Sequence, residues 1–126
     1  MHLLWLWVPV ALDAALIYYV SSIPRLPSPP GPFSDKHFHF GSYALLATLL
    51  VRALASARFH NVNGRVAIGA ILLATLYGVT DEIHQIFVPG RTAALDDLVA
   101  DALGAATAAG LLLAWAIIRR RQRRVA

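Results

Sequence analysis

The stretch "VAIGAILLATLYGVTDEIHQIFVPGR", residues 66–91, decides the fold, because an apolar segment runs directly into a polar one. A helix that crosses a bilayer needs about 20 mostly apolar residues. Residues 66–87 supply that length, yet their second half carries Asp81, Glu82, His84 and Gln85. Acidic side chains inside a membrane are costly and usually pair or serve a function, so this stretch predicts a membrane helix with a polar, functional end.

Composition places the whole chain in a membrane. Of its 126 residues 58% are hydrophobic and only 14% are charged, which is too few polar residues to cover a water-soluble surface. The absence of cysteine excludes disulfides and thiolate metal sites. The first twenty residues lack the basic start and the cleavage pattern of a signal peptide, so we expect a retained helix there.

The predicted fold is all-α, a polytopic membrane protein with four transmembrane helices in one compact bundle that forms a single domain, 1–126. The expected helices are 3–20, 37–54, 66–87 and 95–118. A basic tail, 119–126, follows the last helix. Five prolines between residues 21 and 35 favour an extended, polyproline-like path along the membrane surface. Gly64 suits a turn at the end of the second loop, and "VPGR", residues 88–91, has the Pro-Gly order of a type II turn.

Basic residues predict the orientation, since cytoplasmic loops carry the excess of Lys and Arg. Arg52, Arg58 and Arg65 flank the second loop, and the tail adds five arginines. We therefore expect a bacterial inner membrane protein with both termini cytoplasmic and a site that faces outward. The tail is interpreted as an anchor attracted to anionic lipid, and no nucleic acid partner is predicted.

All acidic residues fall in the predicted outer half of the chain. They are Asp13, Asp35, Asp81, Glu82, Asp96, Asp97 and Asp101. A rise of about 1.5 Å per residue puts Asp13, Tyr43, Asp81 and Asp101 near one depth, roughly 10 Å below the outer boundary. Four helices would thus each contribute a polar group to one layer inside the bundle.

Spacing indicates which helix faces point inward. Three stripes repeat every four residues, namely Asp35, His39 and Tyr43; Tyr77, Asp81 and Gln85; and Asp97 and Asp101. In the last helix "GAATAAG", residues 104–110, offers small side chains that let membrane helices approach closely.

These residues also carry a resemblance to a known family. The segments "SSIP" (21–24), "DKHFHFGSYALL" (35–46) and "YGVTDEIHQIFVPGRTAALDDLVADALGA" (77–105) resemble the VanZ-like family, small bacterial membrane proteins named for a member associated with teicoplanin resistance. The family pattern falls on Asp35, Lys36, His39, Tyr43, Asp81, Glu82, Gln85, Arg91, Asp97 and Gly104. Asp101 departs from it, since the family often has Asn there. The resemblance implies a role in the cell envelope and in glycopeptide tolerance, a form of antibiotic resistance.

Two cations suggest an anion site. Arg91 follows a tight turn, and a guanidinium binds phosphate or carboxylate in a bidentate manner. With Lys36 and His39 it would form a rim for a lipid phosphate or a pyrophosphate-linked sugar. The alternative is that Arg91 pairs with Asp96 or Asp97 and anchors the turn.

Crowded carboxylates suggest proton chemistry. Asp81, Glu82 and Asp97 would raise one another's pKa and favour a shared proton, and His39 could act as a base. The alternative is a polar network that only locks the helices together. The candidate catalytic residues are His39, Asp81, Glu82 and Asp97, and the candidate substrate-binding residues are Lys36, Arg91, Tyr43, Gln85, Asp35, Asp101 and Asp13.

No cofactor and no metal site is predicted, because no recognised ligand spacing is present. His39 with Glu82 and either Asp35 or Asp81 would nevertheless offer nitrogen and oxygen ligands for a divalent ion. His84 is interpreted as a lining or interface residue. For Asp13 we expect Arg91 or Lys36 as the partner, or a proton shared with Asp81.

Three classes of function stay open from the sequence. One is an enzyme that modifies or hydrolyses a phosphate-bearing or polyprenyl-linked envelope lipid, another is a non-catalytic binder of such a lipid or of a glycopeptide, and the third is a small proton-linked carrier. Membrane lipids are the expected partners. The carrier would need a homo-oligomer, because four helices without inverted repeats offer no alternating pathway.

Overall fold

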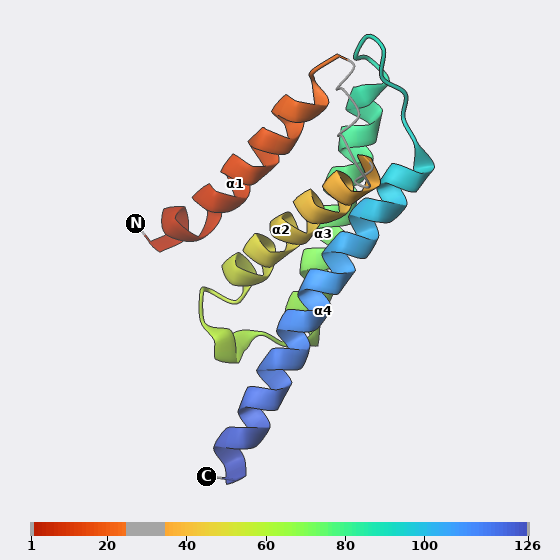
Figure 1. Cartoon of the computed structure of the whole chain (residues 1–126). Helices are drawn as coiled ribbons and strands as arrows, with labels where there is room; N and C mark the ends of the chain where they lie inside the picture. Colours follow the sequence, from red (N-terminus) through yellow and green to blue (C-terminus); the bar gives the residue numbers. More distant parts are fainter. Residues whose placement is uncertain (1, 25–34, 126) are drawn as a thin grey trace.

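The computed structural model of the protein describes residues 2–24 and 35–125, and every regular element in these ranges is helical (Figure 1). The elements are α1 His2–Ser21, α2 Asp35–Leu54, the short 3-10 helix η1 Phe59–Asn61, α3 Gly64–Gln85 and α4 Leu95–Val125. The prediction of an all-α fold with four long helices is confirmed. The path predicted for the proline-rich loop concerns mainly residues 25–34, which lie outside the described residues.

Several helix boundaries differ from the predicted ones, and two of the differences concern charged residues. Helix α2 begins at Asp35, so Asp35 and Lys36 lie on its first turn. Helix α4 continues through the basic segment to Val125, because arginine and glutamine favour helix and neither proline nor glycine follows Gly110. In Figure 1 the C-terminal part of α4 extends beyond the other helices. The basic tail is therefore a continuation of the last helix.

The two described connections use different turn chemistry. Gly90 has a φ of 83°, and the Arg91 amide donates to the Val88 carbonyl at 3.1 Å, as expected for a turn with glycine at its third position. The turn predicted at Gly64 is wrong, because Gly64 is the first residue of α3, where the side chain of Asn63 accepts from the next two backbone amides. Positive φ values occur instead at Ser56 and Ala57.

Small residues let α2 and α4 pack most closely in the bundle. A Cβ on Gly104 would lie 2.1 Å from the backbone oxygen of Phe40, so the α2 backbone passes directly over this glycine. Ala105 and Ala109 on the same helix are fully buried. The predicted close approach of the 104–110 segment is thus confirmed, except that Gly110 has open space around it.

Three of the four helices are long and apolar enough to cross a membrane, namely the segments Leu3–Ser21, Gly64–Gln85 and Leu95–Arg123. The prediction that all four helices meet this condition is wrong for α2. Its 20 residues include Lys36, two histidines and Arg52, which lower its mean hydropathy. Several of these polar side chains bond to α1 and α4, as described below. Much of the polarity of α2 therefore lies on faces that contact other helices.

Candidate functional site

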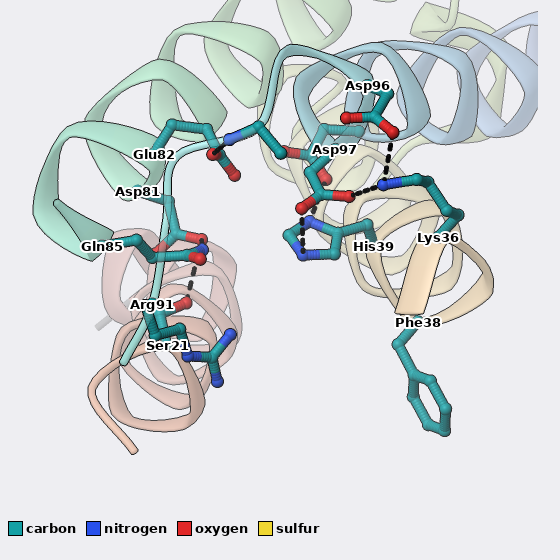
Figure 2. A network of polar contacts seen from close by, with 12 residues as sticks. Ser21, Lys36, Phe38, His39, Asp81, Glu82, Gln85, Arg91, Asp96 and Asp97 are labelled. Carbon is teal, nitrogen blue, oxygen red and sulfur yellow. Dashed lines mark hydrogen bonds and ion pairs between the residues drawn. The ribbon is translucent and has the colours of Figure 1, made fainter. Parts of the chain in front are cut away.

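Four helix ends meet at one end of the bundle. Ser21 at the end of α1 donates to Asp81 near the end of α3 at 2.9 Å, and Lys36 at the start of α2 donates to Asp97 at the start of α4 at 2.5 Å. The sequence places polar side chains at each of these ends, and the alternating helix directions bring them together (Figure 2). The predicted inward-facing stripes therefore converge as expected.

Lys36 lies between two carboxylates. Its Nζ atom is 2.7 Å from Asp96 Oδ2 and 2.5 Å from Asp97 Oδ1. Lys36 lies outside the membrane-spanning segments, and its hydrogen bonds to Asp96 and Asp97 raise the pKa of its ammonium group well above the usual range. Its charge is thus already paired within the protein.

His39 lies one turn further along α2 and is nearly buried. Its Nδ1 atom is 2.9 Å from Asp101 Oδ1, and its Nε2 atom is 3.9 Å from Asp97 Oδ2. A carboxylate on one ring nitrogen fixes the tautomer and the orientation of the ring. His39 is consequently held by α4, while its Nε2 atom has no close hydrogen bond to another described residue.

Asp81 forms a second polar group with α1. Its Oδ2 atom accepts from Ser21 at 2.9 Å and from Gln85 Nε2 at 3.1 Å (Figure 2). One turn earlier, the Tyr77 hydroxyl donates to the Ala14 carbonyl at 2.6 Å. The stripe of Tyr77, Asp81 and Gln85 thus lies on one face of α3, as its spacing predicted, and Tyr77 and Asp81 bond to α1.

Arg91 bonds to the backbone at the end of α1. Its Nε donates to the Ile23 carbonyl at 3.1 Å and its Nη2 donates at 3.0 Å to the Val20 carbonyl, which also accepts from the Ile23 amide. The alternative in which Arg91 pairs with Asp96 or Asp97 is wrong, because Arg91 donates to these carbonyls, and the described ion pairs of the two carboxylates are with Lys36 and His39.

Glu82 connects α3 to the start of α4. Its Oε2 atom accepts from the Ala94 amide at 2.8 Å, which fixes the segment just before α4. His84, in the same turn of α3, lies 2.9 Å from the Ser22 hydroxyl and against the Tyr18 ring, with ring centroids 4.3 Å apart. The interpretation of His84 as an interface residue is confirmed.

A cavity of about 580 Å³ lies between α1 and α2 and reaches α3. Its apolar lining consists of Leu16, Ile17, Val20, Phe38 and Leu45, and its polar lining consists of Asp13, Ser21, Asp35, His39, Ser42, Tyr43, Asp81 and Arg91. The predicted layer is thereby recovered in large part, because Asp13, Tyr43 and Asp81 line one space. Lys36 does not line it.

Several buried oxygens in this region have no hydrogen-bond partner among the described residues. They are Asp13 Oδ2, Tyr43 Oη, Asp81 Oδ1, Glu82 Oε1 and Asp101 Oδ2. Two of the partners expected for Asp13 are not formed, since Lys36 and Arg91 bond elsewhere, and the proton shared with Asp81 stays a prediction. Leaving buried polar atoms unpaired costs about 1–3 kcal/mol each, so five of them at one end of a small protein require an explanation.

Gly78 allows Asp101 and Tyr43 to approach α3 closely. A Cβ at this position would lie 2.9 Å from Asp101 Oδ2 and 3.3 Å from Tyr43 Cε1. The missing side chain therefore lets Asp101 and Tyr43 pack directly on α3. Sequence reasoning missed Gly78, Ser21 and Ser22 as contributors, although each stands in a segment that carries the family resemblance.

Comparison with known proteins identifies the family of the chain. The model of the family described as VanZ/LLP1 matches residues 7–118, which is most of the chain. The chain belongs to the VanZ/LLP1 family. No curated protein and no solved structure gives a significant match.

The VanZ/LLP1 match includes parts of all four helices and every residue that lines the cavity. The predicted recognition of the family is thereby confirmed. Within this VanZ/LLP1 chain, Asp101 is fully buried and bonded to His39. The resemblance leads us to expect Asn at this position, and the Asp found there is part of the polar cluster.

Proposed function

We propose that this VanZ/LLP1 protein binds a phosphorylated envelope lipid in the cavity between α1 and α2. The head group points toward Asp13 and Asp81, the phosphate lies near Arg91, and the acyl chains leave over Leu16 and Phe38. In this arrangement α2 beyond its first turn also lies within the bilayer, with its polar side chains turned toward α4 and the cavity.

The observation that carries the proposal is the set of unpaired oxygens on the cavity wall. Asp13 Oδ2, Tyr43 Oη and Asp81 Oδ1 are buried, have no partner among the described residues, and belong to residues that line the same space. Ionised carboxylates only accept hydrogen bonds, so a ligand that satisfies them must offer donors. A head group with hydroxyl or ammonium groups, as in phosphatidylglycerol or phosphatidylethanolamine, meets this requirement.

The remainder of the cavity suits a lipid. Its volume falls within the range of about 300–1,000 Å³ that is usual for small-molecule sites. Leu16, Phe38 and Leu45 are each about half exposed or more at its rim, where they would contact acyl chains in a bilayer. Figure 2 shows Phe38 pointing away from the polar network.

Arg91 supports the placement of a phosphate. A guanidinium has five N–H groups, and the two bonds to α1 carbonyls leave others for a phosphate oxygen. Lys36 contributes less than the sequence suggested, because both of its carboxylate partners are already within hydrogen-bonding distance. We therefore assign the anion contact to Arg91.

Filling the cavity tests the proposal. Gly41 lines the cavity and a Cβ at this position meets nothing within 4 Å, so we expect the side chain of Gly41→Leu to extend into the cavity. Gly110→Leu is the matched control, because Gly110 also has open space but lies away from the cavity. In lipid nanodiscs analysed by native mass spectrometry, Gly41→Leu should lose retained phosphatidylglycerol or phosphatidylethanolamine several-fold and Gly110→Leu should not. Equal retention in both variants would reject the cavity as the lipid site.

Polyprenyl phosphate tests whether the phosphate alone is sufficient for binding or whether a hydroxyl or ammonium group in the head group is also required. Its head group is a phosphate monoester without an alcohol hydroxyl or an ammonium group, so it should bind more weakly than phosphatidylglycerol when the phosphate is fully ionised. Stronger binding of polyprenyl phosphate that disappears in Arg91→Ala would shift the proposal to a site selective for the phosphate alone.

Acid–base chemistry on the bound lipid is the second candidate function. It is favoured by His39, which lines the cavity and is oriented by Asp101 as a general base is in many enzymes. Incubation with lipid followed by mass spectrometry of the products tests it. Turnover that is lost in His39→Ala but kept in Gly110→Leu indicates an enzyme, intact lipid indicates a binder, and proton flux into vesicles indicates a carrier.

The outward orientation and the link to glycopeptide tolerance belong to the same proposal. The native chain has no cysteine, so Thr92→Cys and His60→Cys give single labelling sites at opposite ends of α3. A membrane-impermeant maleimide should label Thr92→Cys in intact cells and leave His60→Cys unlabelled; the reverse pattern rejects the orientation. Teicoplanin tolerance of cells that express the wild type should fall with Gly41→Leu if tolerance depends on lipid binding.

A further inference from the structure

A cluster of three ionisable side chains lies beside the cavity, where α2, α3 and α4 meet. His39, Glu82 and Asp101 each place one nitrogen or carboxylate oxygen within 4.8 Å of the other two. Each helix supplies one residue, so the packing of the bundle itself sets their separation.

Two carboxylate oxygens of this cluster have no partner among the described residues. They are Glu82 Oε1 and Asp101 Oδ2, and the two residues are only 7% and 0% exposed. Among the described residues, Lys36 and Arg91 are the basic side chains nearest this end, and both are engaged elsewhere, since Lys36 bonds to Asp96 and Asp97 while Arg91 bonds to carbonyls. A buried carboxylate needs a compensating charge, and His39 can supply at most one.

We propose that His39, Glu82 and Asp101 bind a divalent cation. One imidazole and two carboxylates form a nitrogen and oxygen donor set that suits Zn²⁺ or Mn²⁺. Zinc binds such donors at about 2.0–2.2 Å, so the 2.9 Å between His39 Nδ1 and Asp101 Oδ1 lets one ion contact both atoms in place of the shared hydrogen. A rotation of Glu82 brings in the third ligand.

A second group of potential ligands is less suited to an ion. Asp35, His39 and Asp97 also lie within 4.8 Å of one another, but Asp35 is exposed and Asp97 already bonds to Lys36. Neither of these acids has an unpaired buried oxygen. The ion is therefore assigned to the group that contains Glu82 and Asp101.

The proposed metal site adjoins the cavity, but metal binding does not require that the cavity bind a lipid. His39 belongs to both, whereas Glu82 and Asp101 do not line the cavity. An ion held by three protein ligands keeps coordination positions for water or for a head-group oxygen. Binding of the ion in detergent without lipid is expected, and it should survive Gly41→Leu even if the proposed lipid site is wrong.

Metal binding to the purified chain tests the proposal. Protein prepared with a tag that lacks histidine and stripped with a chelator is dialysed against Zn²⁺ or Mn²⁺, and bound metal is measured by mass spectrometry. We expect one ion per wild-type chain and an affinity reduced by roughly tenfold or more in Glu82→Gln and in Asp101→Asn. Asp96→Asn is the matched control, because Asp96 is exposed and outside the cluster, and it should bind as the wild type does.

Two further outcomes decide the assignment. Loss of the ion in Asp35→Asn with retention in Asp101→Asn would overturn it in favour of the other group, and the absence of saturable binding would overturn it outright. X-ray absorption of the metal in the wild type is independent of whether a variant folds. It should show nitrogen from one imidazole with oxygen for the remaining ligands, and a spectrum without histidine would refute the site.

Discussion

The two ends of the bundle use charged side chains in opposite ways. At the basic end, Arg52 donates to the Trp5 and Leu6 carbonyls, and Arg120 donates to the carbonyls of Ala116 and Val62. At the acidic end, the described side chains leave five buried oxygens without a partner. The arginines are thus paired with backbone, whereas the acids are paired only in part.

This difference distinguishes charged side chains that hold helices together from those that are available to bind a ligand. A guanidinium that binds a carbonyl joins two helices and needs nothing else. A buried carboxylate with one unpaired oxygen lowers the stability of the protein unless a ligand, an ion or a proton completes it. The acidic end is therefore where we place both the lipid site and the cation, and variants at the two ends should behave differently.

The largest effect is expected at Gly104, which sets the distance between α2 and α4 beneath the acidic cluster. In Gly104→Ala the new Cβ meets the Phe40 carbonyl at 2.1 Å, so the two helices must separate. We expect a loss of about 3 kcal/mol or more in the free energy of unfolding, at the upper end of overpacking effects. Thermal unfolding in detergent measures it. Gly110→Ala, which meets nothing, should be unchanged or slightly more stable, and a similar loss in both variants would contradict the packing argument.

An intermediate effect is expected for the two carboxylates that share Lys36. Asp97→Asn leaves Lys36 with a weaker buried contact, since the Asp97 side chain is only 8% exposed, and we expect a loss of about 1–3 kcal/mol. Asp96→Asn removes a contact that is largely exposed to solvent and should change the unfolding midpoint little. Denaturant or thermal unfolding of both variants at one pH compares them. Equal effects would mean that burial does not distinguish the two pairs.

Much of the fold was predictable because its signals are local. Runs of apolar residues gave the four helices to within a few residues at most ends, and the Pro-Gly order gave the turn at Gly90. The end of α4 was not predictable from apolarity, since Arg119 to Val125 continue the helix through propensity alone. The prediction that α2 is apolar enough to cross a membrane was wrong. Its polar residues bond to other helices, and a hydropathy average counts them as polar wherever they point.

The candidate site was predictable as a set of residues but not as a set of pairs. Four-residue spacing placed Asp35, His39 and Tyr43 on one face, and they do line one cavity. The partner of Arg91 could not be foreseen, because the backbone carbonyls of α1 carry no sequence signal. The grouping of Glu82 with Asp101 likewise depends on how α3 crosses α4 at Gly78, which spacing within one helix cannot show.

The smallest effect is expected at the basic end, which sharpens the comparison from the other side. Arg52→Ala loses the donations to the Trp5 and Leu6 carbonyls and the contact of the guanidinium with the Trp5 ring, 5.4 Å from its centroid. Those carbonyls lie in the first turns of α1 and keep their helical partners, so we expect a loss of only about 0.5–1 kcal/mol. Arg52→Lys, which keeps the charge, should recover part of it, and neither variant should alter lipid or zinc binding. If Arg52→Ala weakened zinc binding as strongly as Asp101→Asn does, the two ends would be coupled, and the division between a structural end and a functional end would fail.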